Sequence, residues 1–543
     1  MAIALAAGVV GPAAAARIVL IPASGNSAYV QARTADAIGD QARAALLFAA
    51  MARAEPANGD LARRAIGAAI DAGDGALALS VARTLPTAAV TLDARLLLIG
   101  DALRRGAIDE AAGLVAKGNS DSEGGFLAPL LRAWSERAAG RDGQTLLANI
   151  AADSPLAPFA AEQRAAMLLR ARRIDEALAL IPQALDNAGG RATRLRLGFA
   201  AMLAGAGRRD EARKLLAGGN DAALNRLDLD RPQAGIAIDT PSLGYSELLT
   251  GLAVGLASGD DRQLPLSLIQ IARMAAPTNS EASLVAALLL DRQSRRRDAL
   301  AILATIPAND PFAPDALDAR TRLLLAETRG AEALAGANAA ATARGALATD
   351  VARLGNVYDE LDRHADAAAA YGRAIALAER EGRPDRWSYR LLRAGQLDKL
   401  DRWPEARAEL QAGLKLAPDE PLLLNYLGYG SLERGEDVAA AESMIRRALA
   451  LRPGDAAITD SLGWALFKSG RTPEAIEALR TAAAAEPADV EINEHLGDAL
   501  YQSGRRFEAR FSWRAALISA EGEARTRIAA KIDNGLSKVT GAP

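Results

Sequence analysis

The sequence predicts an all-α fold, a right-handed α-solenoid of helical hairpins. Half of the 543 residues are hydrophobic but only 4% are aromatic, and alanine is the most frequent apolar residue. Alanine is the strongest helix former, and its small side chain lets helices approach closely. A motif also recurs every 34 or 35 residues in the last third of the chain. A chain of this length is too long for one hydrophobic core, so we expect a repeat array.

Composition excludes several kinds of chemistry. The 64 basic and 67 acidic side chains give a net charge of −3, so no overall basic character attracts nucleic acid. The absence of cysteine removes thiolate catalysis, disulfides and cysteine-bound zinc. The sequence also lacks a phosphate-binding loop, an H-E-x-x-H metal helix and a G-x-S-x-G elbow. We therefore expect no catalytic residue, no cofactor and no metal site.

The first 16 residues form an apolar run that ends in small residues, with an A-x-A cleavage pattern at Ala14 to Ala16. The run is shorter than the roughly 20 residues of a spanning helix. We expect a signal peptide over 1–16, export to the periplasm or cell envelope, and no integral membrane span. The run has no basic residue before it, so a cytoplasmic chain with an alanine-rich leader is the alternative.

A Leu-Gly pair marks each repeat of the C-terminal third. The pairs recur at intervals of 35 and 34 residues, at Leu427-Gly428, Leu462-Gly463 and Leu496-Gly497. Each unit also carries an alanine, a large apolar residue four positions later, and in most units a closing proline. These residues are Ala406, Leu410 and Pro418; Ala441, Ile445 and Pro453; Ala475, Leu479 and Pro487; and Ala509 and Trp513. This is the tetratricopeptide pattern, with a period of 34 residues and two antiparallel helices per unit.

The residue types explain the predicted hairpin. Small residues such as Gly428 let the two helices touch, and the large residue after the alanine fills the gap to the next unit. Proline at the end of the unit cannot continue the second helix. The strings GRTPEA (470–475) and GRRFEA (504–509) are predicted turns, in which glycine ends the first helix and an acid begins the second.

The spacing of the repeat motif, and the places where it weakens or breaks, divide the chain into segments. We predict N-terminal TPR-like hairpins over 24–218, an irregular linker over 219–244, degenerate helical repeats over 245–345, a C-terminal array of five repeats over 346–521, and a capping helix with a tail over 522–543. The linker contains two prolines and several aspartates. A loop that inserts into a groove and gates it is the alternative for this segment.

Thirteen of the 21 aromatic residues lie between Tyr358 and Trp513. Four of them, at Tyr358, Tyr371, Phe511 and Trp513, are assigned to the core by their repeat position. The sequence positions beside each Leu-Gly pair are predicted to face a concave groove. They are occupied by Tyr, Trp, Asn and acidic residues, which is the composition of a recognition surface. The predicted partner-binding residues are Asn356, Asn425, Tyr426, Tyr429, Asp460, Ser461, Trp464, Glu494, His495 and Asp498. Packing between repeats is the alternative role of the aromatics.

Four C-terminal strings carry a more specific resemblance, namely LLNYLGY (423–429), DSLGWAL (460–466), INEHLGDA (492–499) and GRRFEAR (504–510). Over about 350–517 the chain resembles a family of large exported tetratricopeptide proteins of Gram-negative bacteria. One member type is an outer-membrane lipoprotein that binds a carboxyl-terminal processing protease and helps it to degrade cell-wall hydrolases. The resemblance implies a superhelical, non-catalytic adaptor whose partner is an envelope protease or its substrates.

The leading hypothesis is a periplasmic scaffold that binds a peptide or helix of a partner protein in its C-terminal groove. Stacked repeats form a preorganised surface, which lowers the cost of ordering on binding. The second hypothesis is a cytosolic assembly or regulatory adaptor that uses the same groove. An enzyme is the third, and its chemistry would have to lie in the segment 218–244.

Overall fold

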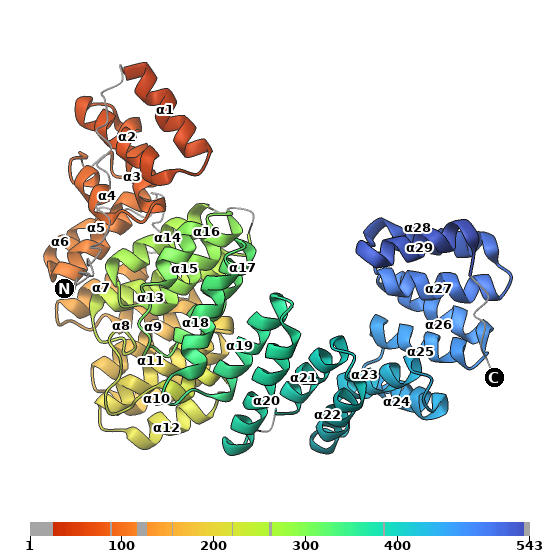
Figure 1. Ribbon diagram of the computed structural model, residues 1–543. Helices are drawn as coiled ribbons and strands as arrows, with labels where there is room; N and C mark the ends of the chain where they lie inside the picture. The colour runs from red at the N-terminus through yellow and green to blue at the C-terminus, as the bar shows by residue number, and fades with distance from the viewer. Residues whose placement is uncertain are drawn as a thin grey trace, which may run out of the picture. The chain divides into compact units, whose positions relative to one another are not determined.

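The computed structural model is all-α over the residues that it describes, which are 25–86, 89–116, 128–151, 153–154, 156–219, 221–259, 263–383 and 386–536. Every regular element in these ranges is a helix, as the sequence predicts (Figure 1). The chain divides into two compact units, unit 1 up to Leu323 and unit 2 from Leu324. The predicted signal peptide at 1–16 lies outside the described residues.

Unit 1 begins with consecutive helical hairpins. Its helices are α1 (Gly25–Ala37), α2 (Gln41–Ala54), α3 (Gly59–Asp71), α4 (Gly75–Ala82), α5 (Leu92–Arg105), α6 (Ile108–Ala116), α7 (Ala128–Ala138), α8 (Gln144–Ala148), α9 (Ala157–Arg170), α10 (Ile174–Asp186), α11 (Ala192–Gly205), α12 (Arg209–Ala217), α13 (Pro241–Leu256), α14 (Gln263–Ala275), α15 (Ser280–Arg292) and α16 (Arg296–Leu303). The boundary between the units falls in α17 (Ala313–Ala326). A 3₁₀ turn at Ala222–Arg226 interrupts the predicted linker over 219–244.

The helices after the linker return to the N-terminal hairpins of unit 1. Helix α14 packs against α3 and α5, and α13 packs against α5, α7 and α9. The Tyr245 hydroxyl donates to the Leu96 carbonyl over 2.9 Å, and a Cβ at Gly244 would overlap the ring of Trp134. Helices α3, α5, α7 and α9 are the first helices of their hairpins. The first-helix side of these four hairpins is therefore covered by α13 and α14 of the same chain.

Unit 2 is a stack of hairpins with short turns. Its helices are α18 (Gly330–Thr342), α19 (Ala348–Glu360), α20 (His364–Arg380), α21 (Trp387–Lys399), α22 (Trp403–Leu416), α23 (Pro421–Glu433), α24 (Val438–Leu451), α25 (Ala456–Lys468), α26 (Thr472–Ala485), α27 (Val490–Gln502), α28 (Arg506–Ser519) and α29 (Gly522–Asn534). From α19 to α28, odd-numbered helices are the first and even-numbered helices the second of each hairpin, and each hairpin packs on the next.

One turn structure recurs between the helices of the hairpins in both units. A residue with positive φ ends the first helix, and the next residue is an arginine whose guanidinium pairs with an acid three positions later, as at Gly470, Arg471 and Glu474. The acid lies in the first turn of the second helix, where the helix dipole favours negative charge. The same Arg–acid pair occurs at Arg173–Glu176, Arg208–Glu211, Arg295–Asp298, Arg329–Glu332, Arg363–Asp366, Arg402–Glu405 and Arg505–Glu508.

The glycine of the Leu-Gly pair marks the closest approach of the two helices of a hairpin. A Cβ at Gly463 would lie 2.6 Å from Cγ of Leu479, and one at Gly497 would overlap the indole of Trp513. Both large side chains are fully buried. The repeat motif therefore encodes one contact, in which a missing Cβ accommodates a large side chain on the facing helix. Within the described ranges, no helix is both long enough and apolar enough to cross a lipid bilayer.

Candidate functional site

The first helices of the last hairpins form the inner side of the stack in unit 2. Helix α23 contacts α25, and α25 contacts α27, whereas the second helices α24, α26 and α28 lack comparably close contacts with one another. A stack whose first helices pack more closely curves toward them. The first-helix face, meaning the surface of α23, α25 and α27 away from the second helices, is therefore its concave side. The predicted site residues from Asn425 to Asp498 belong to these three helices.

Trp464 lies at the centre of this face, in a network that joins all three helices. Its ring stacks on His495 of α27, with 4.0 Å between the ring centroids and 15° between the planes. The indole Nε1 donates to Glu433 of α23 over 2.5 Å. The ring of Trp464 also stacks on that of Phe467, with 4.9 Å between the ring centroids. Trp464 is only 8% exposed and belongs to the hydrophobic core, so it contributes to packing between repeats.

His495 completes the network through its imidazole. Its Nδ1 lies 2.9 Å from the nearer carboxylate oxygen of Asp460, and both side chains are buried. Burial alone would lower the pKa of His495, but the hydrogen bond to Asp460 and the charges of Asp460, Glu491 and Asp498 outweigh burial and raise the pKa. The imidazolium form is thus favoured between an aromatic ring and a carboxylate.

Three predicted residues of α23 are half-buried. The Tyr429 hydroxyl donates to Glu491 of α27. The Tyr426 hydroxyl donates to Asp398 of α21 over 3.2 Å. Burial and the neighbouring carboxylates raise the pKa of both phenols, so both remain donors at neutral pH. The Oδ1 atom of Asn425 has no hydrogen-bond partner among the described residues.

Glu494 and Asp498 are covered by the capping helix α29. Arg527 and Lys531 lie 2.8 Å and 2.7 Å from Glu494, and Lys531 also lies 2.6 Å from Asp498. Burial would raise the pKa of Glu494, but these two cations hold it at about 2. Burial raises the pKa of Asp498 despite Lys531 and the indole of Trp513. Both carboxylates are already partnered within the chain.

The remaining two predicted residues lie apart from this network. Ser461 is buried, and its hydroxyl donates to the Ala457 carbonyl of its own helix over 2.9 Å. Asn356 lies on α19, where its exposed side chain accepts a hydrogen bond from Tyr371 over 2.7 Å. Six of the ten predicted residues are buried, namely Asp460, Ser461, Trp464, Glu494, His495 and Asp498.

The exposed polar groups of the face lie one helical turn from the predicted positions. Glu433 and Lys468, each five residues after a Leu-Gly pair, both have side chains 40% exposed, and they lie 3.9 Å apart across α23 and α25. Glu491, five residues before Leu496, is also exposed. These residues were not predicted. The repeat spacing identifies them, because positions three or four residues apart share a helix face.

The prediction that Phe511 belongs to the core is wrong. Its side chain is 55% exposed, whereas Trp513 is fully buried. Two residues apart on a helix are about 200° apart around its axis, so both cannot point into the same core.

A buried ionic cluster in unit 1 was also not predicted. Arg191 contacts Glu162 at 2.8 Å, Glu247 at 2.7 Å and Glu281 at 3.0 Å, and Arg194 contacts Glu247 at 2.6 Å. Burial raises the pKa of Glu162 to about 7 against the attraction of Arg191. The cluster joins α9 and α11 to α13 and α15, so its ion pairs help to hold α13 and α15 against the earlier helices of unit 1. No periodic pattern in the sequence marks residues that are so far apart along the chain.

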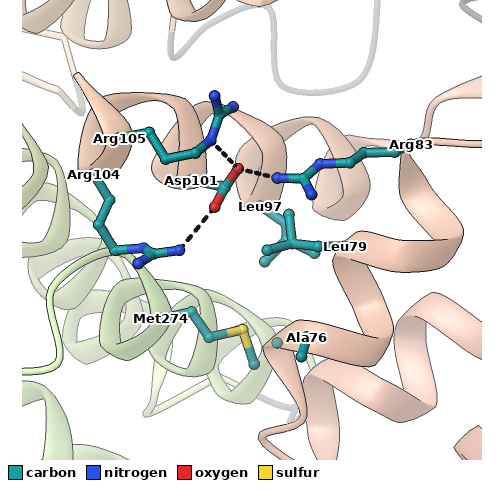
Figure 2. A pocket seen from close by; sticks show the side chains of 9 residues that line it. Ala76, Leu79, Arg83, Leu97, Asp101, Arg104, Arg105 and Met274 are labelled. Carbon is teal, nitrogen blue, oxygen red and sulfur yellow. Dashed lines mark hydrogen bonds and ion pairs between the residues drawn. The ribbon is translucent and has the colours of Figure 1, made fainter. Parts of the chain in front are cut away.

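Unit 1 also contains a cavity of about 530 Å³ between α4, α5 and α14. Figure 2 shows the guanidinium groups of Arg83, Arg104 and Arg105 converging on Asp101, while Leu79, Leu97 and Met274 supply apolar lining. Hydrogen bonds from the arginines lower the pKa of Asp101, although burial opposes them. The charges at the mouth of this cavity are thus paired with one another. Among the described residues, no three His, Asp or Glu side chains are arranged to hold a metal ion.

Sequence comparison places a known repeat in unit 2. Residues 353–421, 396–456 and 461–524 match the Tetratricopeptide repeat family. A TPR repeat-containing protein of Pseudomonas aeruginosa is 31% identical over 83 residues, which are 15% of this chain and 14% of that protein.

Comparison with solved structures gives further matches. A thermophilic TPR protein of Thermus thermophilus matches with 22% identity and a TM-score of 0.30, covering 34% of this chain and 97% of its own. Cut9-Hcn1 of the APC/C matches with 16% identity and a TM-score of 0.37, covering 95% of this chain and 97% of its own. MamA matches with 20% identity and a TM-score of 0.26, covering 31% and 94%. The motif, the hairpins and the family match coincide within 353–524, and over these residues the chain is similar to tetratricopeptide repeats.

Proposed function

We propose that the chain is a non-catalytic scaffold that binds a segment of a partner protein along the first-helix face of unit 2. The observation that carries the proposal is the placement of two exposed carboxylates. Trp464 donates to Glu433 and Tyr429 donates to Glu491, so buried and half-buried aromatic side chains fix both carboxylates on the concave side of the stack. Fixed, exposed acceptors of this kind lose little entropy when a ligand binds.

The proposed partner segment is extended or helical and carries basic side chains. A lysine or arginine of the segment pairs with Glu433 or Glu491, and its apolar groups contact Tyr429 and Leu422, which is 40% exposed on α23. The first helices α3, α5, α7 and α9 of unit 1 do not offer the same open face, because α13 and α14 pack against them.

Selection from a displayed random peptide library on the full chain tests this proposal. We expect enriched peptides with lysine or arginine, whose binding is lost in the Glu433→Lys and Glu491→Lys double variant. The Glu405→Lys and Glu477→Lys double variant is the matched control, because it makes the same charge change on the second helices α22 and α26. Peptides that bind both variants equally would contradict the proposal.

We further propose that the scaffold works in the cell envelope as an adaptor for an envelope protease or its substrates. The apolar leading run and the resemblance over 350–517 support this part of the proposal. The mass of the mature chain in a fractionated cell tests the location. A chain cleaved near Ala16 in the periplasmic fraction supports export, whereas an intact Met1 in the cytosolic fraction supports the cytosolic adaptor instead. Recovery of a protease from an envelope extract by the full chain, but not by the Glu433→Lys and Glu491→Lys variant, tests the partner.

A further inference from the structure

The outer face of α28 exposes three large apolar side chains. Phe507, Phe511 and Ile518 are 74%, 55% and 84% exposed, the three highest values for large apolar residues in the described part of unit 2. Their spacing of four and seven residues places them on one side of the helix. The two phenyl rings contact each other edge to face, with 4.9 Å between the centroids. Clustered exposed apolar side chains mark interaction surfaces, whereas single ones do not.

Three arginines accompany this apolar stripe. Arg506, Arg510 and Arg514 are exposed, and in the described ranges none of them forms an ion pair. The Arg506 guanidinium lies over the ring of Tyr501, and Arg510 donates to the Ile532 carbonyl over 3.1 Å. The acid of the helix, Glu508, is already paired with Arg505 and Arg480. The exposed side of α28 thus combines an apolar stripe with uncompensated positive charge.

We propose that this face of α28 binds the surface of an anionic phospholipid bilayer. Phe507, Phe511 and Ile518 enter the boundary between head groups and acyl chains, and the arginines contact lipid phosphates. An amphipathic helix with aromatic residues on one side and arginines beside them is suited to this shallow insertion. Each basic residue near an anionic surface adds to the attraction.

The charge and shape of the face favour a bilayer over other occupants. A second copy of the chain, docked by a twofold axis, would bring Arg510 and Arg514 of both copies together. Because α28 is a second helix, it lies on the convex side of the stack, and a single convex helix offers less area than a stable protein interface buries. A bilayer does not require a concave surface. The proposal does not depend on the first-helix face.

Flotation of the full chain with vesicles tests the proposal. The probes are vesicles of phosphatidylcholine alone and of phosphatidylcholine mixed with phosphatidylglycerol. We expect binding to the anionic vesicles, weakened at least about tenfold by Phe507→Ser with Phe511→Ser, since each phenyl loses apolar contact. Arg510→Gln with Arg514→Gln should weaken binding about tenfold and remove most of its salt dependence. Ile38→Ser is the control, because Ile38 is 74% exposed in unit 1 and should leave flotation unchanged.

Circular dichroism establishes that each variant keeps its helices, as expected for exposed positions. The proposal is overturned if the wild-type chain fails to float with anionic vesicles, or if the Phe507 and Phe511 substitutions leave flotation unchanged. It is also overturned if the chain self-associates through these phenylalanines, or binds polyglutamate through them, without binding vesicles. Those two results would instead assign the face to a second copy or to an acidic protein.

Discussion

Trp464 and His495 lie face to face, with 4.0 Å between the centres of their rings, and so connect two successive repeats of unit 2. The imidazole is also held by Asp460 at its Nδ1 atom, and the indole is held by Glu433. The contact therefore does two things. It fixes α27 on α25, and it orients an exposed carboxylate on the concave side of the stack. Packing and recognition depend on the same side chains.

Replacement of Trp464 by alanine is therefore expected to loosen the stack rather than only to weaken binding. Removing a buried indole costs about 3–5 kcal/mol in a protein core. We expect faster hydrogen–deuterium exchange in α25 and α27 of the Trp464→Ala variant. Lys468→Ala truncates an exposed side chain whose ammonium group lies 4.8 Å from the ring centroid, and it should change exchange little. Unchanged protection in the tryptophan variant would show that this indole is not a packing residue.

The titration of His495 should reflect its carboxylate neighbour. The chain has two histidines, so in a His364→Gln variant an imidazole resonance reports His495 alone. We expect a midpoint above the ordinary value of 6.5, shifted down by Asp460→Asn. Because the folded pKa is raised, the contribution to stability is complete below about pH 6.5 and is lost as pH rises through the folded pKa. A midpoint at or below 6.5 would contradict the proposed imidazolium.

The capping helix should be sensitive to acid. The pKa of Glu494 is held at about 2 by Arg527 and Lys531, against an ordinary value of 4.5. Its contribution is present above pH 4.5 and is lost as pH falls toward 2. We expect Lys531→Met to raise the pH of acid unfolding, followed by near-ultraviolet circular dichroism. Lys415→Met, at an exposed lysine elsewhere in unit 2, should not. Equal midpoints for both variants would argue against the ion pair.

The buried cluster of unit 1 carries one more carboxylate than it has arginines. Because the pKa of Glu162 is raised to about 7 from 4.5, its ionisation weakens folding increasingly as pH rises through that interval. Glu162→Gln leaves two carboxylates with two guanidiniums. We expect it to increase the protection of α9 and α13 from hydrogen exchange above about pH 7. Arg191→Met should strongly reduce protection at the same pH, since it leaves buried carboxylates unpaired. Reduced protection in Glu162→Gln would contradict this charge balance.

The repeat motif accounts for the parts of the fold that depend on local contacts. The Leu-Gly spacing predicts the hairpins of unit 2, and the strings around Gly470 and Gly504 predict turns that the structure has. The contact of Gly497 with Trp513 likewise follows from residues within one repeat. In each case the interacting groups are less than one period apart, so their spacing along the chain determines their placement.

Long-range packing could not be predicted in the same way. The return of α13 to α5 joins Tyr245 to Leu96, residues that no periodic pattern relates. The frame of the repeat placed Asp460, Trp464 and His495 on the first helices, but their burial depends on side chains from neighbouring repeats and from α29. The exposed groups, Glu433 and Glu491, differ from the predicted ones by a single helical turn.

Photo-crosslinking with a library-selected peptide locates the bound segment on unit 2. A benzoylphenylalanine replaces Lys468 on the first-helix face in one variant and Thr481, an exposed residue of the second helix α26, in another. We expect a crosslink to the peptide from position 468, suppressed by Glu433→Lys with Glu491→Lys, and none from position 481. A crosslink from position 481 alone would show that the partner binds the opposite side of the stack.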